Sequence, residues 1–153
     1  MALKKPALEA QAVEAVSKCG YPEPHYSKVM PREKRRLGDA FGLTRIGVNR
    51  TTLLPGKISA LRHWHTAEDE FVWVIEGEVV LVSNRGEEML RAGDCAGFRA
   101  GVADGHHFQN RSDREAVLVE IGSRRAAEDT CYYPDNGVIV EPGRKVRHFA
   151  ADT

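Results

Sequence analysis

The sequence predicts a single all-β domain, a sandwich or barrel of short strands preceded by a short helix and an extended arm. From Phe41 onward, short runs rich in β-branched and aromatic residues recur at near-regular spacing. Turn signals such as Pro55-Gly56 and Asn84-Arg85-Gly86-Glu87 separate these runs. This combination is typical of all-β sandwiches and barrels, and 153 residues suffice for one such domain with its own core.

The first forty residues carry a different pattern. Between Pro6 and Lys18, apolar residues recur at a helical spacing, and Gly20 is placed to end the helix. The prolines of Tyr21-Pro22-Glu23-Pro24 favour an extended arm after it. The basic run Arg32–Arg36 is interpreted as a solvated face, with binding of a phosphate or an acidic partner as the alternative.

The predicted strands begin with the alternation at 43–48 and the β-prone run at 51–54. After these, the expected strands are Ile58–His65, Phe71–Ile75, Val79–Ser83, Met89–Leu90, Cys95–Phe98, His106–Asn110, Ala116–Ile121 and the edge strand Val138–Val140.

The first chemical signal is a histidine pair one residue apart, His63 and His65. In a strand, alternate residues point to one face, so the two imidazoles would lie together. Three acidic residues follow, Glu68, Asp69 and Glu70, and one carboxylate at the start of the next strand could join them. Alternation does not separate Glu68 from Glu70, because both have the same parity.

A second histidine cluster lies in Gly105–Asn110, where His106, Phe108 and Asn110 would share one strand face. His106 and His107 would point to opposite faces, so only one of them can join the first cluster. Imidazoles and a carboxylate from different strands of a small barrel indicate a metal site.

These residues resemble the motifs of the cupin superfamily. The first motif reads Gly56, six residues, His63-Trp64-His65, four residues, Glu70, six residues and Gly77, with one residue more than usual after Gly56. The second motif reads as follows: Gly93, five residues, Arg99-Ala100-Gly101, four residues, His106, three residues and Asn110. Arg99 replaces the usual proline, and the stretch before His106 is two residues longer.

The resemblance implies a double-stranded β-helix, the jelly-roll cupin barrel, over 41–122. Residues 1–40 would then form the N-terminal helix and arm, and 123–153 a C-terminal extension packing on the barrel. The family intervals favour His63, His65, Glu70 and His106 as metal ligands. Three imidazoles and one carboxylate leave open positions on an octahedral ion, which favours Fe(II), Mn(II), Ni(II) or Co(II), while four-coordinate Zn(II) is the alternative.

Three functions are consistent with such a site. The chain is similar to single-domain cupins described as sugar-phosphate isomerase-like, in which a metal-dependent enzyme acts on a small sugar or sugar phosphate. The alternatives are an Fe(II)-dependent dioxygenase and a non-catalytic module that binds or senses a small ligand. Glu68 and His107 are the only guesses for a general base, and Arg62 and Arg99 are candidates for holding a phosphate. The resemblance also implies a homodimer, with the arm 21–30 as the element exchanged between the two copies.

Composition limits the other partners. The chain has 22 lysines plus arginines and 22 aspartates plus glutamates, so its charge gives no reason to expect nucleic acid or an anionic membrane. No apolar run is long enough to span a bilayer, and the N-terminus lacks an apolar signal-peptide core. Three cysteines without a C-x-x-C pair are typical of reduced thiols, so we expect a cytoplasmic protein.

Overall fold

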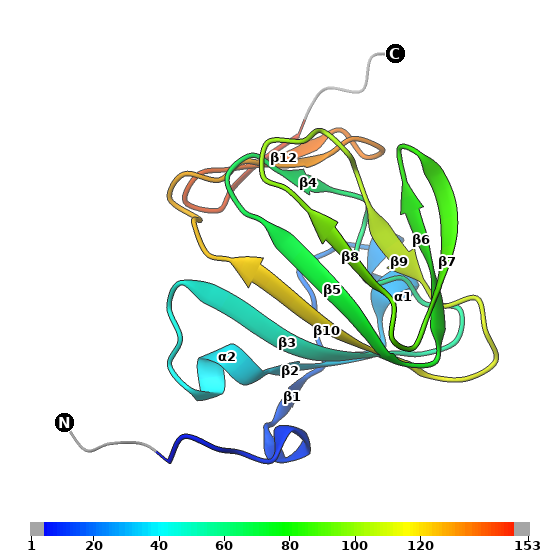
Figure 1. The fold of residues 1–153 in the computed structure, drawn as a ribbon. Coiled ribbons are helices and arrows are strands. Elements are labelled where there is room, and N and C mark those ends of the chain that lie inside the picture. Colours follow the sequence, from blue (N-terminus) through cyan, green and yellow to red (C-terminus); the bar gives the residue numbers. More distant parts are fainter. Residues whose placement is uncertain (1–4, 149–153) are drawn as a thin grey trace.

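The computed structural model describes residues 5–148, and most of its regular secondary structure consists of short antiparallel strands (Figure 1). The predicted all-β fold is therefore confirmed. Its largest sheet has six strands, in the order β1 (Ala15–Val16), β2 (Arg32–Arg36), β3 (Ile46–Leu53), β10 (Ala116–Ser123), β5 (Glu70–Glu76) and β8 (Cys95–Phe98).

Two smaller sheets complete the barrel. One has the order β7 (Gly86–Arg91), β6 (Glu78–Ser83) and β9 (His107–Gln109). The other has the order β13 (Lys145–His148), β12 (Val138–Glu141), β11 (Cys131–Tyr133) and β4 (Trp64–His65).

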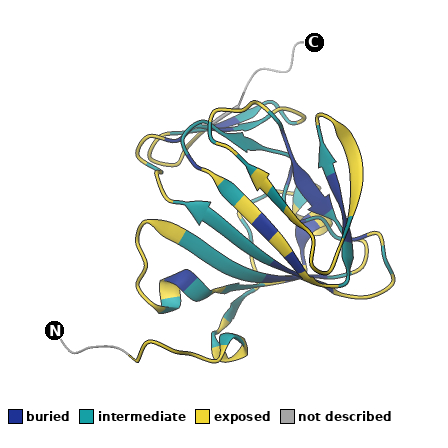
Figure 2. Cartoon of the chain, viewed as in Figure 1, coloured by how far each residue is buried: buried dark blue, intermediate teal, exposed yellow. Residues whose placement is uncertain are grey.

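The core lies between the six-stranded sheet and the three-stranded sheet. Alternate residues of β5 and β10 face it, and the same alternation leaves Phe71, Trp73 and Ile75 exposed on the outer face of β5 (Figure 2). The buried cluster comprises Leu53, Val72, Val74, Val79, Leu81, Phe108, Ala116 and Leu118.

The N-terminal region differs from the prediction. The helix expected over residues 6–18 is a single 3₁₀ turn, η1 (Ala10–Ala12), followed by β1. Ala15 and Val16 pair with Arg35 and Lys34 of β2, so the backbone of this segment is used in a sheet rather than in a helix. Two short helices lie further along the chain, α1 (His25–Val29) and α2 (Leu37–Ala40). None of the helices within 5–148 is long and apolar enough to cross a membrane.

The basic run Arg32–Arg36, interpreted from the sequence as a solvated face, forms strand β2, whose backbone pairs with β1 on one side and β3 on the other. Arg32, Lys34 and Arg36 therefore alternate with Glu33 and Arg35 across the two faces of the sheet. The run is only partly solvated, because Arg32 is buried and Lys34 and Arg35 are half-buried.

The predicted strand Ile58–His65 is only partly formed. Ile58 and His63 make isolated bridges to Gln109 and His106, and regular pairing is confined to β4. Two backbone carbonyls between Ile58 and His63 accept hydrogen bonds from imidazoles. The Ala60 carbonyl accepts from His107, and the Leu61 carbonyl accepts from His63. Those carbonyls are then engaged by side chains in place of a neighbouring strand, and the segment bends.

Gly77 closes the turn between β5 and β6 for a local reason. Its φ is 75°, in the left-handed region that favours glycine. A Cβ at this position would lie 2.6 Å from the carbonyl oxygen of Glu115, so the chain passes too closely here for any other residue.

Candidate metal centre

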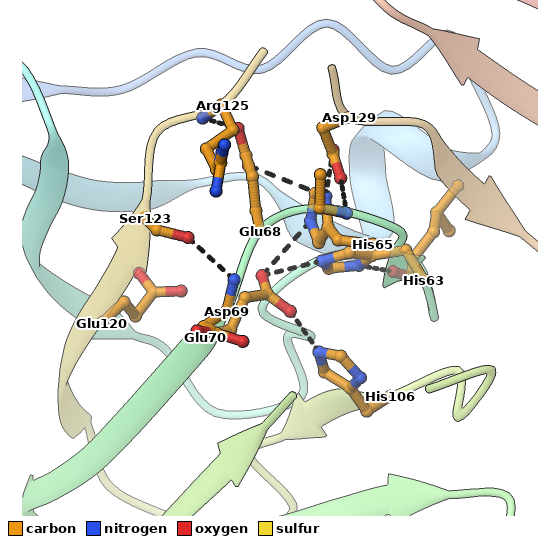
Figure 3. Close-up of polar contacts among 12 residues, drawn as sticks. His63, His65, Glu68, Asp69, Glu70, His106, Glu120, Ser123, Arg125 and Asp129 are labelled. Atoms are coloured by element: carbon orange, nitrogen blue, oxygen red, sulfur yellow. Dashed lines mark hydrogen bonds and ion pairs between the residues drawn. The ribbon is translucent and has the colours of Figure 1, made fainter. Parts of the chain in front are cut away.

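The three histidines selected from the sequence converge on the carboxylate of Glu70 (Figure 3). The Nε2 atoms of His63 and His65 lie 3.3 Å and 3.4 Å from Oε1 of Glu70. The Nε2 atom of His106 lies 2.5 Å from Oε2. All four predicted ligands are therefore brought to one place.

Three segments of the chain supply this cluster, because His63 directly precedes β4. His65 lies in β4, Glu70 begins β5, and His106 directly precedes β9. His63 and His106 face each other through two backbone hydrogen bonds of 3.3 Å and 3.1 Å, which fixes the two imidazole-bearing segments side by side. The ring of Phe98 stacks on the His106 ring with centroids 3.5 Å apart, so β8 supports the imidazole from below.

The opposite nitrogen of each imidazole has an acceptor of its own. Nδ1 of His63 lies 2.7 Å from the Leu61 carbonyl, and Nδ1 of His106 lies 2.8 Å from the Asp104 carbonyl. Nδ1 of His65 lies 2.6 Å from a carboxylate oxygen of Asp129. Carbonyls and carboxylates only accept hydrogen bonds, so we assign the proton of each ring to Nδ1.

This assignment tests whether the residues fit a metal ion. In a neutral imidazole with its proton on Nδ1, Nε2 presents a bare lone pair. Three such lone pairs would face a carboxylate, which is repulsive unless positive charge lies among them. A divalent cation supplies that charge, and hydrogen-bonded Nδ1 groups are the usual support of histidine ligands. The donor set therefore fits a divalent metal.

The pKa values of Glu70 and His65 also indicate that this site favours positive charge beside the carboxylate. Burial raises the pKa of Glu70, but hydrogen bonds from His106, His63 and His65 outweigh it and hold that pKa far below its ordinary range. Burial lowers the pKa of His65, whereas its hydrogen bonds to Cys131 and Glu70 raise it, with a net pKa of about 11. Without a metal, hydrogen bonds from the three imidazoles stabilise the charged form of the Glu70 carboxylate.

The structure separates Glu70 from the alternative carboxylates. Glu68 lies behind His65, on its Nδ1 side at 3.7 Å, and accepts a hydrogen bond from the Arg125 amide. Asp69 accepts a hydrogen bond from the Ala100 amide, so it points away from the centre.

The structure also distinguishes the adjacent histidines. His107 is buried on the other side of its strand, where Nδ1 donates to the Ala60 carbonyl at 2.7 Å and Nε2 lies 3.0 Å from the side-chain amide of Gln109. Burial lowers the pKa of His107, which keeps this imidazole neutral. Neither guess for a general base, Glu68 or His107, faces Glu70.

Asp129 is the residue of the candidate centre that sequence reasoning missed. It is 3% exposed, and its second oxygen accepts a hydrogen bond of 2.9 Å from the Ala67 amide. Asp129 lies 64 residues after His65, outside both motifs, in the predicted C-terminal extension. No local pattern marks such a residue, because only the packing of the C-terminal extension brings it to His65.

Arg62, one of the two phosphate candidates, already has partners. Its guanidinium makes two hydrogen bonds of 2.8 Å and 3.0 Å to Asp135 and contacts Asn84 and the Gly105 carbonyl. It therefore ties together three segments around the site and is not free for an anion. Arg99 is exposed.

Aromatic side chains form the wall beside His63. The Tyr133 ring lies 5.6 Å from the His63 ring, and Tyr21 from the N-terminal arm meets Tyr133 edge to face at 6.2 Å. Burial raises the pKa of both phenols, so both remain protonated at neutral pH. Tyr132 faces the other way and stacks on Trp64.

Comparison with known proteins is consistent with this geometry. A family model described as a cupin domain matches residues 49–122, which contain all four candidate ligands. No curated protein gives a significant match.

Solved structures give longer matches. A structure described as a sugar phosphate isomerase from the cupin superfamily, from Silicibacter pomeroyi DSS-3, is 37% identical, with 97% of this chain and 99% of that chain covered and a TM-score of 0.87. A protein from Acidithiobacillus ferrooxidans, described as a candidate sugar phosphate isomerase, is 29% identical over 76% of this chain and 74% of its own, with a TM-score of 0.71. A polyketide cyclase from Streptomyces resistomycificus is 17% identical over 97% of this chain and 89% of its own, with a TM-score of 0.64, and shares the fold alone.

Proposed function

Because this chain belongs to the cupin superfamily, we propose that it is a metal-dependent enzyme that rearranges a small polyhydroxylated substrate, in the manner of a sugar phosphate isomerase. The observation that carries the proposal is the convergence of His63, His65 and His106 on Glu70. The likeness to the Silicibacter protein over nearly the whole chain supports the substrate class.

In this proposal the four ligands hold one divalent ion among Fe, Mn, Ni, Co and Zn. A bound ion of this kind polarises a carbonyl or hydroxyl oxygen of the substrate and lowers the free energy of developing negative charge on it. Leu61, Asp104 and Asp129 orient the three imidazoles through Nδ1. Phe98 and Tyr133 pack beside the ligands and limit the access of water.

Proton exchange tests this proposal over a whole series of sugars at once. The protein, loaded separately with each of the five metals, is incubated in D₂O with aldose and ketose phosphates of three to six carbons. Isomerisation through proton transfer replaces a C–H hydrogen by deuterium, and NMR detects it even when the equilibrium favours the starting sugar. We expect exchange with at least one metal and none with the His63→Ala/His65→Ala variant. No exchange with any metal or sugar would contradict the isomerase proposal.

A second candidate is an Fe(II)-dependent dioxygenase, which the same donor set favours, since three neutral imidazoles and a carboxylate leave positions open on an octahedral ion. Oxygen consumption by the Fe(II)-loaded protein distinguishes the two candidates, because isomerisation consumes no oxygen. Retention of a small ligand without turnover would instead favour a non-catalytic binding protein.

A further inference from the structure

A charged pair lies on the same sheet face as Glu70 and has no part in the metal centre. Nζ of Lys34 on β2 lies 3.6 Å from Oε1 of Glu120 on β10, and the Thr51 hydroxyl on β3 donates a hydrogen bond to the same oxygen. Both charged side chains are 23% exposed, whereas Thr51 is fully buried. The pair is therefore accessible to solvent, and the buried Thr51 hydroxyl fixes the position of the Glu120 carboxylate.

The strand register places this pair next to the centre. Glu120 lies opposite Val72, and Gly122 lies opposite Glu70, so Glu120 and Glu70 are one step apart along the same face. Two residues along a strand and one strand across correspond to about 8 Å between the two Cα atoms. Figure 3 shows Glu120 beside the Asp69–Glu70 segment. A ligand of a few carbon atoms can span this separation.

The position beside Glu70 on β10 carries no side chain. A Cβ at Gly122 would meet only the Asp69 carbonyl oxygen at 3.5 Å, an ordinary van der Waals contact, and Gly122 has no positive φ. Neither packing nor backbone conformation requires glycine at this position. Because Gly122 has no side chain, it does not fill the space between the Glu120 and Glu70 side chains.

The surroundings argue against a purely structural ion pair. On the side of β5 and β10 the neighbouring residues on this face are aliphatic, and Leu118, Val72 and Val74 are at most 5% exposed. On the side of β3 the neighbours are the polar Thr51 and Asn49. A partly buried pair at 3.6 Å loses hydration without the close contact that would compensate for it, so an aliphatic pair would stabilise this face at least as well. Lys34 supplies hydrogen-bond donors and Glu120 supplies acceptors, and together they match hydroxyl groups, which do both.

We propose that Lys34 and Glu120 form a polyol subsite, which binds the vicinal hydroxyls of a ligand whose other end lies at the metal centre. The inference rests on the proposed function and deepens it by naming the part of the substrate that is recognised away from the metal. Thr51 positions Glu120, and Gly122 provides the space between the subsite and Glu70.

The test uses two probes of the same carbon length, xylitol with five hydroxyls and pentane-1,5-diol without vicinal hydroxyls. Mn²⁺-loaded protein broadens the NMR lines of any molecule held near the ion. We expect broadening of xylitol and not of the diol by the unmodified protein. Glu120→Gln, which keeps an acceptor for Thr51, and Lys34→Met should each reduce the xylitol broadening at least fivefold with unchanged Mn²⁺ content.

The control is Glu33→Gln, which removes the neighbouring carboxylate on the opposite face of β2 and should leave the xylitol broadening unchanged.

A third variant, Gly122→Val, places a side chain between the subsite and Glu70 and should also abolish the xylitol broadening. Equal broadening of the two probes, or full xylitol broadening by Mn²⁺-replete Lys34→Met and Glu120→Gln, would overturn the proposal. If the protein takes up no Mn²⁺, the proposed metal-dependent function is contradicted, whereas the subsite proposal is still testable.

Saturation-transfer NMR of the metal-free protein then measures binding of xylitol and of the diol to the same variants. Loss of xylitol binding in Lys34→Met and Glu120→Gln supports the subsite, and unchanged binding overturns it.

Discussion

Nδ1 of His65 donates a hydrogen bond of 2.6 Å to Oδ2 of Asp129 and so connects the C-terminal extension to the candidate metal centre. The other oxygen of this carboxylate accepts a hydrogen bond from the amide of Ala67, in the connection between β4 and β5, which holds the carboxylate in place. His65 therefore has its Nε2 directed at Glu70 by a residue that lies outside the barrel strands.

Replacing the Asp129 carboxylate by a neutral amide should weaken metal binding without unfolding the protein. Asp129→Asn keeps the size of the side chain but replaces the carboxylate, and partners of this kind typically change metal affinity by about 10–100-fold. Chelator competition measures the affinity. Glu128→Gln, a neighbouring exposed position, is the control and should bind as the unmodified protein does. Equal affinity of Asp129→Asn and the control would show that the negative charge of Asp129 does not strengthen metal binding through His65.

The two adjacent histidines give a direct test of the ligand set. Elemental analysis of protein purified without chelator or metal-affinity tag should find near-stoichiometric metal in the unmodified chain and little in His106→Ala. His107→Gln should retain its metal, because His107 is directed to the Ala60 carbonyl instead of Glu70. Metal loss in His107→Gln with retention in His106→Ala would reverse the assignment.

Gly77 is expected to be the glycine most sensitive to substitution. Gly77→Ala and Gly56→Ala both place a side chain at positive φ, 75° and 80°, at a cost of about 1–2 kcal/mol each. Only at Gly77 does the new Cβ collide with backbone, so we expect a further loss of about 1–3 kcal/mol. Urea denaturation measures both free energies of unfolding, and equal values would show that the β5–β6 turn can shift to make room.

The ion pair between Arg62 and Asp135 should stabilise the fold in a pH-dependent way. Hydrogen bonds from Arg62 hold the pKa of Asp135 below its ordinary 3.8. A lowered folded-state pKa means stabilisation that is present above about pH 4 and is lost as the pH falls through the folded-state value. Asp135→Asn should lower the free energy of unfolding by about 0.5–1 kcal/mol at pH 7, because the carboxylate is half exposed and screened.

The loss in Asp135→Asn should shrink as the pH is lowered below about 4 in a series of denaturation curves. Asp113→Asn, whose carboxylate is 92% exposed, serves as the comparison and should show no such dependence. A pH-independent loss in Asp135→Asn would mean that geometry, and not charge, connects the two residues.

The homodimer expected from the family resemblance stays a prediction. The outer face of β5 exposes Phe71, Trp73 and Ile75, and their exposed fractions are 39%, 48% and 37%. We expect light scattering to give twice the 17.0 kDa chain mass. Trp73→Glu should shift the mass towards a monomer, whereas Val102→Glu, a change at an exposed loop residue, should not. A monomeric unmodified chain would remove the prediction.

Local sequence patterns predicted the positions of several barrel strands. Alternation and turn residues predicted β8 with its observed bounds, Cys95–Phe98, and β5 and β6 to within one residue at each end. The helix over 6–18 was wrong because a helical spacing of apolar residues does not reveal a neighbouring strand edge, here β2, with which Ala15 and Val16 pair. β11 was missed because its three residues are too few to show a period.

The sequence by itself determined the two histidine clusters and the acidic stretch of the candidate centre, and the intervals of the cupin resemblance selected His63, His65, Glu70 and His106 among them. Only the tertiary structure decided what supports and surrounds them. Asp129 reaches His65, and Lys34 and Glu120 reach the face of Glu70, through pairing between strands far apart in the chain. The physical reason is that hydrogen-bond partners and sheet neighbours are set by distance in space, whereas a sequence pattern records only distance along the chain.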